Sequence, residues 1–94
     1  MNPMIKTLLI EDNRSLAETI IAYLALENID CDYAETGSQG LEFGLTHPYD
    51  VILLDINLPS LSGLKVCEQL RAQGADVSVL MLTAGGTIEE KLAG

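Results

Sequence analysis

The stretch VILLDINLP, from Val51 to Pro59, decides the fold, because four apolar residues end in a single acid and a proline follows closely. An apolar run of this length is typical of a parallel strand that is buried on both faces. Asp55 stands where such a strand reaches the edge of its sheet, and Pro59 favours a turn away from it. The stretch therefore predicts a buried strand that presents one carboxylate at its carboxyl end.

Three other segments have strand patterns. KTLLIEDN (6–13) is an apolar run that ends in acids, and DVSVLMLTA (76–84) is nearly all apolar, as in a strand from a sheet interior. DCDYAET (30–36) alternates acidic and apolar residues, which is typical of a half-exposed strand at a sheet edge.

Helical patterns separate these strands. The first predicted helix stops near Asn28, and its apolar face carries Leu16, Ile20, Tyr23 and Leu24. The second predicted helix carries Leu41 and Leu45 and ends at His47 and Pro48. The third ends at Gly74 and has Gly63, Val66, Cys67 and Leu70 on one face, and a fourth starts at the capping box from Thr87 to Glu90. Strand and helix thus alternate four times. Short right-handed connections would make a doubly wound parallel α/β sheet with helices on both faces, whose ligands bind beyond the carboxyl ends of the strands.

Three acids belong to that predicted rim. Glu11 and Asp12 leave the first strand and Asp55 leaves the third, so the three carboxylates converge if those strands are neighbours. Close anions raise one another's pKa values, and a bound cation relieves the repulsion; oxygen ligands at an open site favour Mg²⁺. The alternative is that such acids merely stabilise helix N-termini. Thr83 and Ala84 end the fourth strand at the same rim, where a hydroxyl and backbone N–H groups suit phosphate oxygens.

The composition narrows the partners. Fourteen acids face five bases, for a formal net charge of -9, which disfavours direct contact with nucleic acid or an anionic membrane. The longest apolar runs are too short to span a bilayer and the N-terminus lacks a signal-peptide core, so we expect a cytoplasmic protein. Cys31 and Cys67 have no metal-site spacing and are expected to be buried thiols.

These motifs together resemble the receiver domains of two-component response regulators. The matching residues are the pair Glu11 and Asp12, the strand VILLD ending in Asp55, the loop DINLPSLSG, and LTA with Thr83. The segment NLPSLSGLKVCEQLR is most similar to the corresponding segment in receivers of the OmpR/PhoB type, which usually carry a winged-helix DNA-binding output domain. The resemblance implies a flavodoxin-like (CheY-like) sheet with strand order 2-1-3-4.

The resemblance also implies roles for single residues. Asp55 would accept a phosphoryl group from a sensor histidine kinase, while Glu11, Asp12, Asp55 and the backbone carbonyl of Asn57 would hold Mg²⁺. Thr83 would donate a hydrogen bond to the phosphoryl group and move with the loop after the fourth strand, and the backbone of Ala84 would contact the same group. Such a domain is a signalling phosphoacceptor and not an enzyme in the usual sense.

The match has a gap. A complete receiver has a fifth strand and helix, including a lysine that contacts the phosphoryl group, and Lys6, Lys65 and Lys91 are not placed to replace it. We therefore expect residues 1–94 to be a single receiver domain that is incomplete at its C-terminus, with short-lived phosphorylation. An exposed fourth strand predicts a homodimer, formed by edge pairing or by exchange of the last helix.

Other functions stay open at this stage. A haloacid-dehalogenase-type Mg²⁺ phosphatase also uses a strand-end aspartate, although that family has an acid two residues later, where this chain has Asn57. A flavodoxin-type nucleotide site is disfavoured because EDNRS replaces a glycine-rich loop after the first strand. A degenerate receiver that serves only as an interaction scaffold is the third alternative, and the retained acids argue against it.

Overall fold

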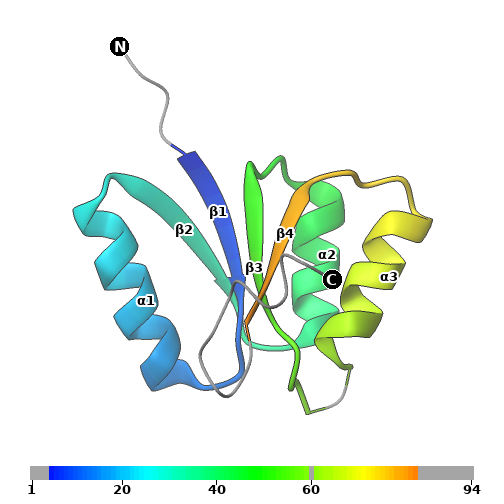
Figure 1. Ribbon diagram of the computed structural model, residues 1–94, viewed down its shortest axis with the longest axis horizontal. Helices are drawn as coiled ribbons and strands as arrows, with labels where there is room; N and C mark the ends of the chain where they lie inside the picture. Colours follow the sequence, from blue (N-terminus) through cyan, green and yellow to red (C-terminus); the bar gives the residue numbers. More distant parts are fainter. Residues whose placement is uncertain (1–4, 60, 83–94) are drawn as a thin grey trace.

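The computed structural model describes residues 5–59 and 61–82, and Figure 1 shows their arrangement. The elements follow one another as β1 (Ile5–Ile10), α1 (Arg14–Leu26), β2 (Ile29–Ala34), α2 (Gly37–Thr46), β3 (Val51–Asp55), α3 (Gly63–Ala72) and β4 (Ser78–Leu82). Each strand expected from the sequence is present. The predicted end of the fourth strand at Thr83 and Ala84, and the helix from Thr87, lie outside the described residues.

The four strands form one parallel sheet in the order β2-β1-β3-β4, which confirms the expected doubly wound topology. The order reverses between β1 and β3, so ligands are expected at the carboxyl ends of these two strands. One row of paired residues crosses the whole sheet, from Tyr33 through Leu9 and Leu53 to Leu80. The register places the ends of β1 and β3 side by side, because Ile10 pairs with Leu54.

The two faces of the sheet are covered by different helices. Leu8 and Ile10 of β1 belong to a buried cluster with Val66 and Leu70 of α3, and residues of α2 pack against it. Figure 1 shows α2 and α3 side by side on this face. Leu9 points the other way and is fully buried outside that cluster, as expected from the alternation of side chains along a strand. α1 packs mainly against β2 on this second face.

The three described helices end where the sequence predicts. Asn13 and Thr36 cap the N-termini of α1 and α2, each accepting a backbone N–H with its side-chain oxygen. Asn28 stops the first helix with a positive φ of 62°, and Gly74 follows α3 with a φ of 90°. Asparagine and glycine are the residues that tolerate this left-handed conformation best, which is why they mark helix ends.

The apolar face predicted for α1 is partly wrong. Leu16 and Tyr23 are exposed, at 45% and 65%, while Ala17 is the buried residue of this helix. The inward face is rotated by about one residue, to a stripe in which Ile20 and Leu24 are half-buried. Both stripes have helical spacing, so the choice between them depends on how the helix lies on the sheet. Leu45 of α2 is likewise exposed instead of facing the core.

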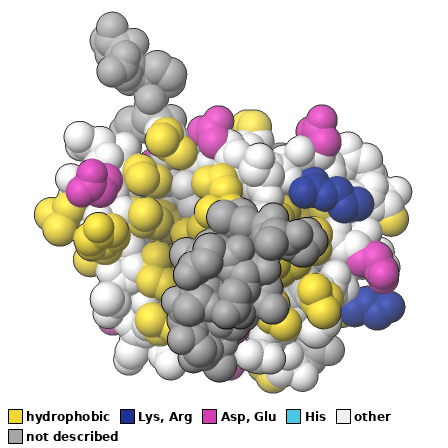
Figure 2. Space-filling model, viewed as in Figure 1, with side chains coloured by type: hydrophobic (Ala, Val, Ile, Leu, Met, Phe, Trp, Pro, Cys, Tyr) yellow, Lys and Arg dark blue, Asp and Glu magenta, His cyan; other side chains and the backbone are white. Residues whose placement is uncertain are grey.

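The two outer strands differ in character. β2 carries charged side chains, as the alternating sequence predicts, and such charges disfavour pairing of an edge strand with another chain. Lys6 of β1 forms ion pairs with Asp30 and Asp32 of β2, at 2.9 and 3.4 Å. β4 pairs with β3 alone within the described residues, and its apolar side chains are half-exposed. Figure 2 shows hydrophobic side chains gathered over the sheet beside α1. None of the helices in residues 5–59 and 61–82 has the length and hydrophobicity needed to cross a membrane.

Candidate functional site

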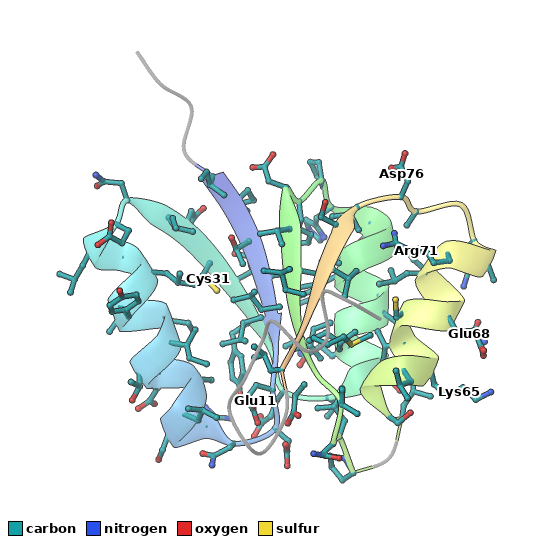
Figure 3. All side chains as sticks on the ribbon, viewed as in Figure 1. Glu11, Cys31, Lys65, Glu68, Arg71 and Asp76 are labelled. Carbon is teal, nitrogen blue, oxygen red and sulfur yellow. The ribbon has the colours of Figure 1, made fainter. Side chains whose placement is uncertain are left out.

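Three carboxylates meet at the carboxyl ends of β1 and β3. Each of Glu11, Asp12 and Asp55 offers an oxygen, and these oxygens all lie within 4.8 Å of one another. Figure 3 labels Glu11 at this end of the sheet, just beyond β1. The convergence follows from the fold, because β1 and β3 are hydrogen-bonded neighbours and their ends are in register. Two elements far apart in sequence thus supply one acidic pocket.

The acids differ in exposure. Glu11 is 3% exposed and Asp55 is 8% exposed, whereas Asp12 is open to solvent. Burial, together with repulsion from Asp55 and Asp12, raises the pKa of Glu11 from its ordinary value of 4.5 to about 7, and the backbone N–H of Asn13 opposes the change. The pocket therefore holds negative charge that is destabilising without a positive partner.

Backbone N–H groups fix the two buried carboxylates. Asn13 donates its N–H to Glu11 Oε2 at 3.0 Å, and Asn57 donates its N–H to Asp55 Oδ1 at 2.9 Å. Each acid is thus held by the residue two positions after it. One oxygen of each carboxylate accepts a backbone N–H in this way.

The loop after β3 is set by a close approach of backbone to backbone. Gly63, the first residue of α3, donates its N–H to the carbonyl of Ile56 at 2.9 Å. A Cβ atom at residue 63 would lie 2.3 Å from the carbonyl oxygen of Asp55, so only glycine fits. Leu58, in the same loop, is buried in the core cluster and so attaches the loop to the core. The first residue of α3 therefore packs directly against the backbone of Asp55 and Ile56.

The donor set fits a small divalent cation. All three side chains offer hard carboxylate oxygens, from two neighbouring strand ends, and one acid is solvent-exposed. Mg²⁺ prefers this kind of site, bound by a few carboxylates while it keeps several waters. A cation there would offset the cost of ionising Glu11. The residues present are thus suited to Mg²⁺.

The other residues expected at the site lie beside the three acids, outside the described residues, or elsewhere on the sheet and helices. Asn57 is exposed and contacts Asp55 through its N–H; the metal-binding role of its carbonyl stays a prediction. Thr83 and Ala84 lie outside the described residues. Lys6 pairs with Asp30 and Asp32 near the other end of the sheet. Lys65 pairs with Glu68 on α3, and Figure 3 shows both at the outer side of that helix.

One contact of the site was not anticipated from the sequence. The hydroxyl of Tyr33, in β2, donates a hydrogen bond to the backbone carbonyl of Glu11 at 2.7 Å. Composition alone favours a packing role for such a tyrosine. The contact depends on the parallel register of the assembled sheet: Tyr33 pairs with Leu9, two residues before Glu11, so its ring lies on the same face as the Glu11 side chain.

Comparisons with known proteins agree with this fold. A family-wide profile described as the response regulator receiver domain matches residues 7–94. The chain belongs to the response regulator receiver family. Receiver domains are signalling modules of two-component systems. This receiver domain is 41% identical over 91 residues to the response regulator ArlR of Staphylococcus saprophyticus, and 42% identical over 89 residues to the transcriptional regulatory protein DltR of Streptococcus agalactiae.

The receiver domain covers only part of these proteins. The matched region is 97% of this chain but 41% of ArlR, and 95% of this chain but 40% of DltR. Among solved structures, a Francisella response regulator receiver domain superposes with a TM-score of 0.83 and 32% identity, covering 98% of this chain and 74% of that one. TrrA of Thermotoga maritima, solved in complex with Mg²⁺-BeF, superposes with a TM-score of 0.82 and 32% identity, covering 86% and 70%.

Proposed function

We propose that this receiver domain is a phosphoacceptor in a cytoplasmic two-component phosphorelay, with Asp55 as the residue that is phosphorylated. The observation that carries the proposal is the meeting of Glu11, Asp12 and Asp55, whose oxygens lie within 4.8 Å of one another. A lone strand-end aspartate has many explanations. A buried aspartate beside two further acids, at the switch point of a doubly wound sheet, is suited to phosphoryl transfer with a metal ion.

The proposed reaction joins Asp55 to phosphorus. One carboxylate oxygen of Asp55 attacks the phosphorus of a phosphohistidine, the P–N bond breaks, and its electron pair passes to the imidazole nitrogen, which is then reprotonated. The product is an acyl phosphate on Asp55. Phosphoryl transfer depends mainly on positioning and charge neutralisation. The N–H of Asn57 supports the positioning, because it holds Oδ1 at 2.9 Å and leaves the second oxygen to react.

We further propose that Glu11, Asp12, Asp55 and the carbonyl of Asn57 hold Mg²⁺. When bound, the ion would neutralise charge on the phosphoryl oxygens. The acids of the chain determine where the positive charge of the ion is favourable, since Glu11 is buried beside Asp55 at the end of the neighbouring strand. The Mg²⁺-BeF complex of TrrA, with 32% identity, supports this assignment.

The remaining roles complete the proposed signalling cycle. A sensor histidine kinase donates the phosphoryl group, and Thr83 and the backbone of Ala84 contact it on Asp55. Movement of the loop after β4 then controls an output domain outside these 94 residues. The similarity to DltR, named a transcriptional regulatory protein, supports a transcriptional output, and a winged-helix domain of the OmpR/PhoB type is the form we expect.

The proposal also includes self-association through β4. The outer edge of this strand presents backbone N–H and C=O groups that no described residue pairs, and half-exposed apolar side chains flank them. Such an edge favours pairing with another strand. A second copy of the chain supplies an identical edge, so we propose a homodimer that joins two β4 strands.

Beryllofluoride titration tests the phosphoacceptor role. With Mg²⁺ present, beryllofluoride should bind the chain and raise its melting temperature, and at a hundredfold excess over Kd the stabilisation should be about 2.7 kcal/mol. Asp55→Asn removes the attacking oxygen and should abolish the shift. Asp50→Asn is the matched control, because Asp50 is exposed and accepts the N–H of Lys6 away from the pocket. A shift that survives in Asp55→Asn would refute the assignment. Absence of any shift in the unsubstituted chain would favour the scaffold alternative.

A further inference from the structure

We infer that Tyr33 is a positioning residue for the metal site: its hydroxyl fixes the peptide that joins Glu11 to Asp12 and thereby sets the Mg²⁺ affinity of the acidic pocket. This inference rests on the proposed function, because it concerns the same three acids. Tyr33 is not a metal ligand. It acts through the backbone carbonyl of Glu11, to which its hydroxyl donates at 2.7 Å.

Glu11 is held at three points, and two of them come from β2. Its N–H donates to the carbonyl of Ala34 at 3.1 Å, and its carbonyl accepts from Tyr33 at 2.7 Å. The third point is its side chain, where Oε2 accepts the N–H of Asn13 at 3.0 Å. The paired residues of β1 and β2 end at Ile10 and Ala34, and the bond from the Glu11 N–H to Ala34 is the backbone contact that follows this pair. The hydrogen bond from the Tyr33 hydroxyl to the Glu11 carbonyl adds one further attachment between β2 and the segment that follows β1.

The position of that carbonyl explains the expected effect on metal binding. The carbonyl of Glu11 and the N–H of Asp12 belong to one planar peptide unit. Fixing the oxygen therefore fixes the direction in which the chain continues to Asp12. Asp12 is the exposed acid of the three, and the rest of the pocket is buried. Without the hydroxyl, the peptide is free to rotate and the Asp12 carboxylate is less well placed beside Glu11 and Asp55.

The hydroxyl is suited to this task. A tyrosine hydroxyl carries one O–H donor, which a backbone carbonyl oxygen accepts. The ring belongs to the same face of the sheet as Leu9. β2 thereby contributes to the site although none of its acids belongs to the pocket.

The chain offers a matched pair of tyrosines for the test. Tyr49 also donates a 2.7 Å hydrogen bond, to Oδ2 of Asp32, which lies part-way along the outer strand β2. Tyr33→Phe and Tyr49→Phe each remove one hydroxyl that makes a hydrogen bond of 2.7 Å. Only the hydroxyl of Tyr33 contacts a residue of the acidic pocket, namely Glu11. Mg²⁺ affinity of both variants and of the unsubstituted chain is measured by calorimetric titration, and unfolding in urea without metal is measured in parallel.

We expect Tyr33→Phe to raise the Kd for Mg²⁺ by about threefold to tenfold, the range that loss of one hydrogen bond produces. Tyr49→Phe should change it by less than about twofold, although both variants lose metal-free stability. In amide NMR spectra, the resonances of Asp12 and Asn13 should shift or broaden in Tyr33→Phe and not in Tyr49→Phe.

The other outcomes overturn the inference in distinguishable ways. Equal Mg²⁺ affinity in all three proteins would show that the hydroxyl does not position the pocket. Equal weakening in both variants would show a general loss of stability instead of positioning. If the unsubstituted chain itself binds no Mg²⁺ at millimolar concentration, the proposed function fails, and this inference fails with it.

Discussion

Replacing Glu11 with glutamine should make the metal-free domain more stable at pH 8 while it abolishes Mg²⁺ binding. Glu11 is 3% exposed, and its pKa is raised from 4.5 to about 7, chiefly by burial. Since one pH unit of pKa difference corresponds to about 1.4 kcal/mol, ionising Glu11 in the folded state costs about 3 kcal/mol. Glutamine has nearly the same shape, carries no charge, and its Oε1 still accepts the N–H of Asn13.

The effect depends on pH in a defined direction. A carboxyl whose folded pKa is raised contributes stability that is present below about pH 4.5 and is lost as the pH rises through about 7. At pH 5 the folded protein keeps the proton on Glu11, so most of the penalty is absent; at pH 8 the group is ionised and nearly the whole penalty applies. The stability gained by Glu11→Gln should therefore be about 2 to 3 kcal/mol larger at pH 8 than at pH 5.

Urea unfolding at both pH values, in the presence of a chelator, measures this difference. Glu18→Gln is the matched control, because Glu18 is exposed on α1 and its replacement makes the same change in net charge. If Glu11→Gln and Glu18→Gln give the same pH dependence, Glu11 is not a strained acid and the electrostatic account of the pocket is wrong. Adding Mg²⁺ should stabilise the unsubstituted domain and leave Glu11→Gln unchanged.

Two further predictions concern the backbone under Asp55 and the edge at β4. Gly63→Ala should cost roughly 1–3 kcal/mol or more in urea unfolding and weaken Mg²⁺ binding, because its Cβ would lie 2.3 Å from the carbonyl oxygen of Asp55. Gly74→Ala, whose Cβ meets nothing within 4 Å but whose φ is 90°, should cost about 1 kcal/mol and leave Mg²⁺ binding intact; equal effects would contradict the packing argument. Leu80→Lys should shift the sedimentation profile at high concentration toward monomer, and a strictly monomeric unsubstituted chain would refute pairing through β4.

Much of the fold was predictable because local patterns and long-range rules agree. The apolar run ending in Asp55 indicated a buried parallel strand, and the alternation around Asp32 indicated a charged edge strand. Both lie where those patterns predict, in a sheet whose order follows the receiver resemblance. Asn28 and Gly74 marked helix ends, since their backbone requirement is local and needs no knowledge of the rest of the molecule.

The inward face of α1 was not settled by such patterns. Leu16 and Tyr23 have the same helical spacing as the residues that turn inward, and only the seating of α1 against β2 decides between the two stripes. The role of Tyr33 was hidden for a related reason. A tyrosine in an edge strand favours packing, and its bond to the carbonyl of Glu11 depends on the register between two strands, which is a property of the assembled sheet.

The sequence by itself determined which residues carry the chemistry: carboxylates at the ends of two apolar runs, in a chain whose formal net charge is -9. Tertiary structure alone decided that Glu11 is buried beside Asp55 while Asp12 stays exposed, and that β2 holds their loop. The physical reason is that residue type sets charge and hydrogen-bonding capacity, whereas burial and distance arise only when separate strands pair. A pKa near 7 for Glu11 therefore belongs to the folded sheet and to no segment of the chain.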